Sequence, residues 1–412
     1  MNKKKIINDP VYGFITVPSD LIFDLIAHPY FQRLRNIKQL GMTHLVYPGA
    51  LHTRFHHALG AMHLMGMAIE TLKSKGHEIS SQEEEAVTIA ILLHDIGHGP
   101  YSHALEHTIV NGISHEHISA LLLDNLNKEF NGKLEMAQQI FNNRYPKLFL
   151  HQLVSGQLDI DRLDYLTRDS FFTGVSEGIV GFDRIIKMLD VSNGQLAIEV
   201  KGIYSVEKFL IARRLMYWQV YLHKTVVAAE LMLVKILERA KYLASKGKKL
   251  FATPNFSYFL NHSISREEFK TQPRNLECFT LLDDYDIYTS VKVWASDDDF
   301  ILSTLCANLL SRNLYQVEIT QEVPDKEKIA ELVTLVRESY PIDEDDVSYF
   351  VFTDTLKNNA YKVDDGSINI LMKDGSVCDI TLASDNSNLE ALSKTVKKHI
   401  LCYIKDIKHT RL

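Results

Sequence analysis

Two histidines and two aspartates, placed in three separate segments of the sequence, could together hold one divalent metal ion. They are His57, the adjacent pair His94 and Asp95, and Asp161. The pair follows an apolar run that ends at Leu93, so we expect the chain to carry it inside the protein. Burying these polar groups without partners would cost several kcal/mol, and a bound metal ion compensates for that cost directly.

The residues that follow the pair predict an opening at this point. Neighbouring residues of a helix point about 100° apart, so His94 and Asp95 can reach one ion only near a helix end. Gly97, Gly99 and Pro100 predict that end. Two neutral imidazoles and two carboxylates balance a charge of 2+ and leave two octahedral positions for water and substrate oxygens. Such a mixture of donors suits manganese, iron or zinc and is compatible with magnesium.

Each segment taken alone also has an ordinary structural interpretation. A single histidine at a helix start, such as His57, is more often a packing or surface residue. The segment 157–165 could be a solvated helix whose acidic residues are balanced by arginines, with Asp161, Asp164 and Tyr165 on one face. The metal hypothesis therefore depends on the three segments together.

The composition is that of a globular protein whose cysteines are reduced. The chain has 412 residues, 46% of them hydrophobic, a net charge of -7 and four cysteines without CxxC spacing. The negative charge argues against a protein that coats DNA or RNA, so nucleic acid is not an expected partner. The sequence contains no apolar run of about 18 residues and no apolar segment after its basic N-terminus. We therefore expect a cytoplasmic protein without a membrane partner.

The apolar pattern predicts a mainly α fold, with an all-helical core in residues 1–313 and a smaller α+β domain in residues 314–412. Apolar residues recur at helical spacing from about residue 21 to 243, and a buried helix is expected up to Leu93. One long helix is expected over 206–244. Beyond Asn313 the period changes. Strands are expected there at 315–319, 349–352, 368–372 and 378–382, and helices at 326–338 and 388–398.

Twelve of the 18 histidines lie between His44 and His117, which places the chemistry in this part of the chain. The ordered set of two histidines and two aspartates resembles that of the HD superfamily of metal-dependent phosphohydrolases. Further segments are similar to those of one branch, the deoxynucleoside triphosphate (dNTP) triphosphohydrolases. These segments are 8–10, 31–35, 37–41, 47–50, 54–55, 94–103 and 159–169. The resemblance covers about residues 5–225 and implies an all-helical HD-domain core.

The resemblance also implies roles for individual residues. The metal ligands would be His57, His94, Asp95 and Asp161. The residues that line the phosphates and carry out acid–base chemistry would be His98, His103, His115 and, in support of His103, Glu106. The triphosphate would be held by Arg54, Arg162, Tyr165 and Arg213. The sugar would be read at its 3′-hydroxyl by Gln39 and Asp169, and Tyr221 would lie where a 2′-hydroxyl would clash.

General chemistry agrees with these roles. A triphosphate carries about four negative charges, which a metal ion and arginines ordinarily hold. Hydrolysis needs an activated water and a protonated leaving oxygen, and histidine titrates in the range suited to moving that proton. Arg213 could equally form a surface salt bridge, and His107 and His117 are expected to be packing or surface residues.

The family also has an activating nucleotide site, and the chain departs from it. Lys5, Asn8, Gln32 and Arg35 match positions of that site, but Ala27 stands where the family has a guanine-reading aspartate. Activation specifically by a guanine nucleotide is therefore not expected, and a different nucleotide could use this allosteric pocket. Leu222 replaces a base-facing glutamine, so the base preference of the family does not transfer. The resemblance further implies a homo-oligomer, either a dimer or a tetramer.

The leading hypothesis is an enzyme that converts a dNTP and water into a deoxynucleoside and inorganic triphosphate. A second hypothesis is an HD phosphohydrolase that acts on a nucleoside monophosphate or a cyclic nucleotide. Tyr221 and Asp169 speak against it, since they fit a deoxyribose pocket. A third is a non-catalytic regulator that binds nucleotide or nucleic acid. A protein that has lost its catalytic activity would be expected to lose metal-ligating residues, and this chain keeps all four.

Overall fold

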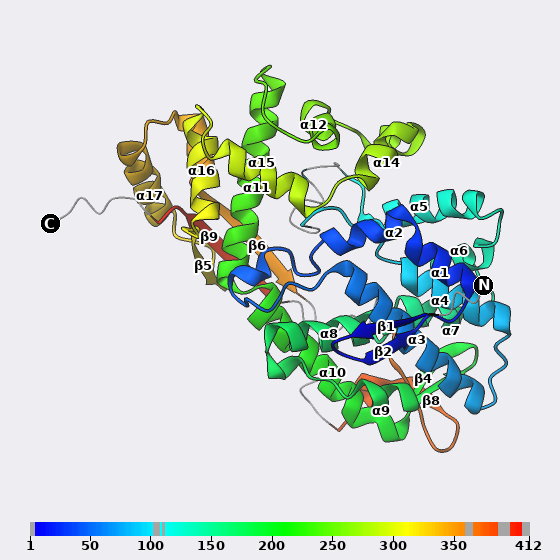
Figure 1. Ribbon diagram of the computed structural model, residues 1–412. Coiled ribbons are helices and arrows are strands. Elements are labelled where there is room, and N and C mark those ends of the chain that lie inside the picture. The colour runs from blue at the N-terminus through cyan, green and yellow to red at the C-terminus, as the bar shows by residue number, and fades with distance from the viewer. Residues whose placement is uncertain (1–4, 102–107, 109–111, 359–365, 386–395, 406–412) are drawn as a thin grey trace.

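The computed structural model describes residues 5–101, 108, 112–358, 366–385 and 396–405. A hairpin of β1 (Ile6–Asp9) and β2 (Gly13–Thr16) begins the chain and lies against the helical core (Figure 1). The helices of the first half are α1 (Asp20–Ala27), α2 (Pro29–Gln32), α3 (Arg54–Ser74), α4 (Ser81–Leu93), α5 (His115–Glu129), α6 (Glu135–Phe141), α7 (Leu148–Val154), α8 (Ile160–Thr173) and α9 (Phe182–Lys187). Short 3₁₀ turns join them at η1 (Arg33–Asn36), η2 (Gly41–Leu45) and η4 (Ser176–Gly178).

The second half alternates between helices and short strands. Its helices are η5 (Val200–Gly202), α10 (Ile203–Met216), η6 (Tyr217–Tyr221), α11 (Lys224–Ser245), α12 (Pro254–Asn261), α13 (Arg266–Thr271), α14 (Pro273–Thr280), α15 (Asp284–Trp294), α16 (Phe300–Leu310), α17 (Lys326–Ser339), η7 (Glu344–Tyr349) and α18 (Ile380–Ala383). Its strands are β3 (Leu189–Ser192), β4 (Gln195–Glu199), β5 (Gln316–Thr320), β6 (Val351–Asn358), β7 (Asn369–Leu371), β8 (Val377–Asp379) and β9 (Val396–Tyr403). The mainly α fold class is confirmed.

Helix α3 lies at the centre of the core, in contact with both α4 and α8. A capping box starts α4, because the Ser80 hydroxyl accepts from the Glu83 N–H and the Glu83 carboxylate accepts from the Ser80 N–H. Residues 86–93 of α4 are all buried, as expected for a helix that is apolar on every side. Helix α8 starts at Asp159, whose carboxylate accepts from the Arg162 N–H.

The prediction of a single helix over 206–244 is wrong, because the structure has three separate helical segments there. Helix α10 gives way to the π-helix η6, and α11 starts afresh at Lys224. The Leu222 N–H donates to the Tyr217 carbonyl at 2.7 Å, a spacing of five residues that defines a π-helical turn. The His223 ring then caps α11 by accepting from the Thr225 N–H at 3.2 Å. Apolar residues continue at helical spacing through the break, so the sequence pattern hides it.

The chain beyond Asn313 forms a smaller α+β part, as expected. Strands β5, β9 and β6 make an antiparallel sheet that lies along α11, and α17 confirms the helix expected at 326–338 (Figure 1). The helix expected at 388–398 is wrong at its end, because Val396 begins β9; residues 388–395 lie outside the described residues. Strands β7 and β8 join β3 and β4 of the core instead, with β4 and β7 parallel. The boundary at residue 313 remains a prediction.

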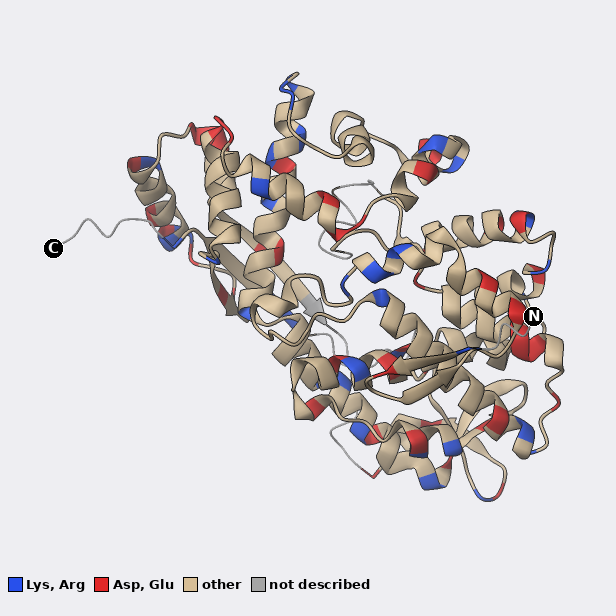
Figure 2. Cartoon of the chain, in the orientation of Figure 1, with Lys and Arg blue, Asp and Glu red and all other residues tan. Residues whose placement is uncertain are grey.

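The surface carries charges of both signs. Acidic and basic residues are interspersed over the helices drawn in Figure 2. Among the helices of the described residues, none combines the length and apolarity that crossing a bilayer requires.

Candidate active site

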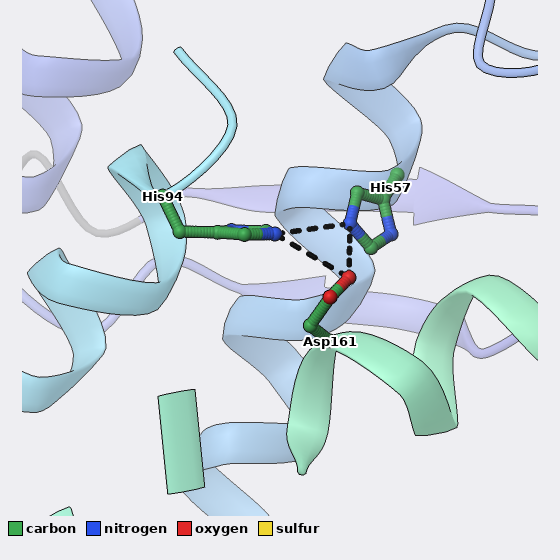
Figure 3. Close-up of side chains that lie close together, drawn as sticks. All are labelled: His57, His94 and Asp161. Atoms are coloured by element: carbon green, nitrogen blue, oxygen red, sulfur yellow. Dashed lines mark hydrogen bonds and ion pairs between the residues drawn. The ribbon is translucent and has the colours of Figure 1, made fainter. Parts of the chain in front are cut away.

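Three helix ends bring His57, His94 and Asp161 together (Figure 3). His57 lies in the first turn of α3, His94 at the C-terminal end of α4, and Asp161 in the first turn of α8. The Asp161 Oδ1 atom is 3.1 Å from His57 Nε2 and 3.4 Å from His94 Nε2. The two Nε2 atoms are 3.4 Å apart. These three donor atoms, on His57, His94 and Asp161, lie close enough together to bind one small cation, and the group is termed the metal nest.

Asp95, the fourth expected ligand, borders the same nest. Its Oδ1 atom is 3.3 Å from His94 Nε2, and its Oδ2 atom is 3.8 Å from His57 Nε2. The Arg54 guanidinium donates to Asp95 Oδ2, and both residues are buried. Arg54, expected to bind the triphosphate, therefore also neutralises one of the carboxylates in this structure.

The hydrogen bonds behind the two histidines fix which ring nitrogen faces the nest. His94 Nδ1 is 2.6 Å from the Ile91 carbonyl oxygen, which can only accept, so the proton lies on Nδ1. His57 Nδ1 likewise donates to Asp164 Oδ2 at 2.7 Å. Nε2 is thus the nitrogen of each ring that faces Asp161, and it can offer its lone pair to a metal ion that displaces any proton there. The donor set fits a divalent cation.

The electrostatics of the nest also suit a cation. Burial lowers the pKa of the His57 imidazole, but its hydrogen bonds with Asp161 and Asp164 outweigh this and raise it to about 10. Burial raises the pKa of Asp161, whereas its hydrogen bonds to His57 and His94 hold it far below the ordinary range. In the metal-free protein, a proton on His57 therefore supplies the positive charge that a bound metal ion would supply in its place.

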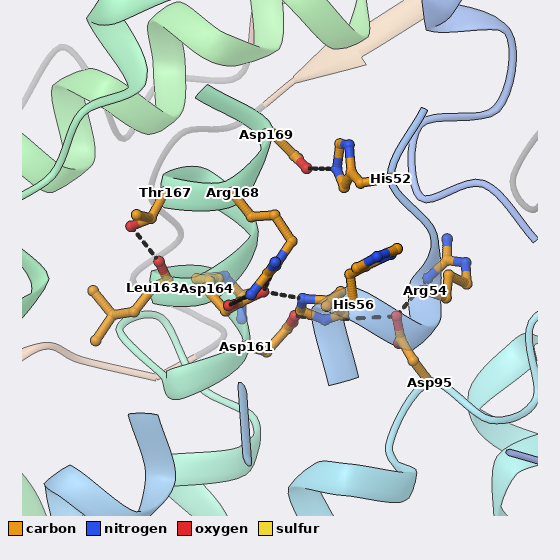
Figure 4. A network of polar contacts seen from close by, with 12 residues as sticks. His52, Arg54, His56, Asp95, Asp161, Leu163, Asp164, Thr167, Arg168 and Asp169 are labelled. Carbon is orange, nitrogen blue, oxygen red and sulfur yellow. Dashed lines mark hydrogen bonds and ion pairs between the residues drawn. The ribbon is translucent and has the colours of Figure 1, made fainter. Parts of the chain in front are cut away.

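A chain of buried ion pairs supports His57 from behind, and Figure 4 shows its Asp164 beside Arg168. Asp164 accepts from Arg168 Nε at 3.0 Å and Nη2 at 3.1 Å, and Arg168 Nη1 donates to Asp9 Oδ2 at 2.7 Å. All of these side chains are buried. The approach of α8 to α3 requires Gly60, because a Cβ there would lie 2.0 Å from Asp164 Oδ1. The N-terminal hairpin, which carries Asp9, is thereby tied to the metal nest.

The turn after Asp95 is anchored on α5. The Ser119 hydroxyl donates to the His94 carbonyl at 2.7 Å and accepts from the Gly97 N–H at 2.9 Å. A Cβ on Gly97 would lie 2.3 Å from the His115 carbonyl oxygen, so only glycine permits this approach. The predicted helix end is confirmed, since α4 stops at Leu93.

Two of the expected catalytic histidines meet beside Asp95. The rings of His98 and His115 are stacked, with centroids 3.8 Å apart and planes 17° apart. His98 Nε2 is 3.4 Å from Asp95 Oδ1. Burial and the nearby Arg54 charge hold the pKa of His98 well below its usual value, so this imidazole is neutral at pH 7. The other two, His103 and Glu106, lie outside the described residues.

Several expected substrate residues present buried polar atoms without a partner among the described residues. These atoms are Arg162 Nε, Arg213 Nε and Gln39 Oε1. Arg162 is held on one side by Asp159, and Arg213 Nη1 is 3.4 Å from Gln157 Oε1. Buried donors and acceptors left open cost stability unless a ligand completes them.

A second cluster joins Asp169, Tyr221 and a residue that the sequence did not suggest, His52. The Tyr221 hydroxyl donates to Asp169 Oδ2 at 2.7 Å, and His52 Nε2 donates to Asp169 Oδ1 at 2.8 Å. His52 Nδ1 is buried and has no hydrogen-bond partner among the described residues. Its ring stacks on Phe172 at 4.5 Å. Tyr165 adds its ring 6.3 Å from that of Tyr221.

The candidate activating-site residues surround α1. Lys5 Nζ lies 4.9 Å above the Phe23 ring, and Gln32 Nε2 donates to the Ile26 carbonyl at 2.6 Å. Gln32 Oε1 accepts from Arg35 Nε at 2.8 Å, and Arg35 stacks on Phe55. Asn8 is exposed on the hairpin, and the role of this group remains a prediction.

Besides His52, sequence reasoning missed Arg168 and Asp9, and it gave Asp164 no function. The signal for Asp164 was present, because it shares a helical face with Asp161. A buried carboxylate next to a ligand histidine is the usual partner of a metal-bound imidazole. Asp9 lies far from the ligands in sequence, and although segment 8–10 contributed to the family resemblance, nothing in it indicated a contact with the metal ligands.

Comparison with known proteins agrees with this geometry. Residues 54–169 match the model of the HD domain, and residues 180–252 match that of the HD associated region. The protein YwfO of Bacillus subtilis is 33% identical over 99% of this chain and 94% of its own length. The crystal structure of a phosphohydrolase from Bacteroides thetaiotaomicron is 55% identical and superposes with a TM-score of 0.94 over 98% of this chain and 100% of its own.

The chain belongs to the HD-domain phosphohydrolases. As a member, it is a metal-dependent phosphohydrolase, and its His and Asp cluster can bind the metal. A Dictyostelium discoideum protein named as the deoxynucleoside triphosphate triphosphohydrolase SAMHD1 homolog is 30% identical over 71% of this chain and 63% of its own length. The resemblance of this HD-domain phosphohydrolase to the dNTP triphosphohydrolases is thus confirmed.

Proposed function

We propose that this HD-domain phosphohydrolase cleaves dNTPs to a deoxynucleoside and inorganic triphosphate. The observation that carries the proposal is the set of buried atoms on Arg162, Arg213, Gln39 and His52 that lack a hydrogen-bond partner among the described residues. Two of these residues are arginines, whose donors suit phosphate oxygens, and the other two offer an amide oxygen and a ring nitrogen suited to hydroxyls. A ligand with a polyanionic end and a sugar end would supply hydrogen-bond partners to both kinds of group.

The metal would be held by His57, His94, Asp95 and Asp161. When bound, a divalent ion (manganese, iron, zinc or magnesium) supplies Lewis acidity towards a phosphate oxygen and activates water. The mixed set of nitrogen and oxygen donors suits each of these metals.

The triphosphate would lie across α8 and α10. Arg162 and Arg213 each offer an open Nε–H, and charge-assisted hydrogen bonds to phosphate are stronger than neutral ones. Burial raises the pKa of the Tyr165 hydroxyl, so it stays protonated and can donate to a phosphate oxygen. Arg54 would exchange part of its contact with Asp95 for the substrate once a metal ion neutralises that carboxylate.

The proton transfers fall to the histidine stack. His98 is neutral at pH 7, because burial and the Arg54 charge hold its pKa well below the usual value, and its Nε2 lies 3.4 Å from Asp95 Oδ1. In the cleavage a water oxygen forms a bond to the α-phosphorus and gives up one proton, the bond from the α-phosphorus to the 5′-oxygen breaks, and the 5′-oxygen leaves with one proton. His115, stacked on His98, is placed to take part in supplying that proton.

The sugar pocket would be formed by Asp169, Tyr221 and His52. Both carboxylate oxygens of Asp169 already accept one bond, so the side chain is fixed in orientation and keeps further lone pairs for a 3′-hydroxyl. Burial raises the pKa of Tyr221 strongly, so its hydroxyl remains a donor to Asp169. A tyrosine held in this way leaves no freedom to move aside for a 2′-hydroxyl.

The test is a panel of the four dNTPs and four ribonucleoside triphosphates with Mn²⁺-loaded protein. Each is supplied alone and in pairs, so that one nucleotide can act as activator of another, and released triphosphate is measured by ion chromatography. We expect triphosphate from at least one dNTP and much less from its ribonucleotide. A His94→Gln variant is the inactive control. Release of pyrophosphate or phosphate in place of triphosphate, or no release from any dNTP, contradicts the proposal.

A further inference from the structure

The π-helix η6 connects the sugar pocket with the C-terminal sheet. Its last residue, Tyr221, bonds to Asp169 in the pocket. Trp218, on the same turn, receives Lys398 of β9, whose Nζ lies 3.7 Å from the centre of the indole ring. Lys398 belongs to the central strand of the sheet of β5, β9 and β6. One turn of helix therefore has contacts to both parts of the chain.

A π-helical turn needs support from outside. It holds one residue more than an α-helical turn, and removing that residue from the turn rotates everything beyond it by about 100°. Such a rotation would take Tyr221 away from Asp169. The turn also leaves main-chain groups to be satisfied, and the Tyr47 hydroxyl donates to the Gln219 carbonyl at 2.7 Å. Tyr47, Asp169 and Lys398 thus hold η6 from three separate segments.

On the C-terminal side, the sheet that carries Lys398 packs on α11 through β5. Arg239 of α11 donates to both carboxylate oxygens of Asp299, at 3.0 and 2.7 Å, and to Asp346 at 2.8 Å. Asp299 directly precedes α16, and Asp346 lies in η7, just before β6. Lys398 therefore reaches Trp218 from a sheet that is attached to α11, and its cation–π contact favours the conformation in which Trp218 lies beneath it.

We propose that Lys398 is a positioning residue for the substrate pocket. By holding Trp218 it keeps η6 in the π-helical register that directs Tyr221 onto Asp169. The C-terminal sheet then takes part in substrate selection although none of its described residues is assigned to the pocket. The identity of the ligand rests on the proposed function, whereas the coupling between Lys398 and η6 does not.

The first experiment measures, without any ligand, how far Lys398 shields Trp218 of η6 from solvent. The chain has two tryptophans, so a Trp294→Phe background leaves Trp218 as the only one. Lys398→Met removes the charge at similar length, Lys398→Arg keeps a cation that stacks on aromatic rings, and Lys397→Met is the matched control. Lys397 is the neighbouring residue, exposed on the opposite face of β9. Acrylamide quenching of Trp218 should rise in Lys398→Met alone. If the background does not fold, difference spectra against Trp218→Phe supply the same signal.

The second experiment measures the effect of the same substitutions on the substrate pocket. KM and kcat are measured for the best dNTP with Mn²⁺-loaded protein. We expect Lys398→Met to raise KM roughly 5- to 30-fold, the range to which a partly desolvated cation–π contact converts, and to change kcat less. Lys398→Arg should restore KM to within about twofold of the parent.

The outcomes separate the two proposals. An unchanged KM in Lys398→Met, or equal changes in Lys398→Met and Lys397→Met, overturns the role of Lys398. If the parent hydrolyses no dNTP, the proposed function fails. The positioning role is then decided by the quenching result together with direct titration of dATP, dGTP, dCTP and dTTP against Trp218 fluorescence. A rise in quenching without a loss of affinity in that titration also overturns it.

Discussion

Replacing Asp164 by asparagine isolates the support that the protein gives to His57. Asp164 is fully buried and accepts from His57 Nδ1 at 2.7 Å and from Arg168 at 3.0 and 3.1 Å. Asparagine keeps the shape but removes the charge and turns one acceptor oxygen into a donor NH₂. That NH₂ must face either the His57 ring or the Arg168 guanidinium, and both of these are donors.

The size of the effect follows from these contacts. Loss of a partner behind a metal-ligating histidine lowers metal affinity by about 10- to 100-fold, which is about 1.4–2.7 kcal/mol. Breaking a buried ion pair costs about 3–5 kcal/mol of folding stability. Arg168 keeps its 2.7 Å bond to Asp9, so we expect the loss of stability to fall at the lower end of that range.

The assay is calorimetric titration of Mn²⁺ into metal-stripped protein, with thermal unfolding of the same samples. Asp183→Asn is the control, because it removes the same charge from an exposed position on α9. Asp164→Asn should bind Mn²⁺ at least tenfold more weakly than Asp183→Asn. Equal dissociation constants for the two variants would refute the reasoning that Asp164 sets the tautomer of His57.

Three further predictions follow from the same structure. Gly60→Ala places a Cβ 2.0 Å from Asp164 and 2.1 Å from Arg168, so it should destabilise the fold by about 1–3 kcal/mol or more in thermal unfolding. Gly66→Ala, on the same helix with open space around it, should be neutral or stabilising, and equal losses would contradict the clash. Burial raises the pKa of Glu230 to about 7, so the folded protein takes up a proton that the unfolded chain releases near its ordinary value. Stability should therefore fall as the pH rises towards 7, and Glu230→Gln should raise the melting temperature at pH 8 by the equivalent of about 1–3 kcal/mol but not at pH 4.5; an equal gain at both would exclude titration as the cause. Removing the metal with a chelator should lower the melting temperature, and Mn²⁺ at about 100 times its dissociation constant should restore about 2.7 kcal/mol; a melting temperature independent of Mn²⁺ concentration would show that no metal binds the native state.

The sequence predicted the parts of this protein whose causes are local. The apolar run up to Leu93 and the glycines after Asp95 predicted where α4 ends. Three segments of His and Asp types sufficed to predict the metal nest, and the change of period after Asn313 predicted the α+β part. These features depend on a few consecutive residues, so the chain itself carries their signal.

Only the tertiary structure decided which distant groups complete the site. Asp9 is linked to His57 through Asp164 and Arg168, and no spacing along the chain announces that contact. The break at η6 is equally hidden, because the bond from Tyr221 to Asp169 that accompanies it joins residues far apart in the sequence. Polar groups buried by packing must find partners wherever the fold places them, and that placement is a property of the whole chain.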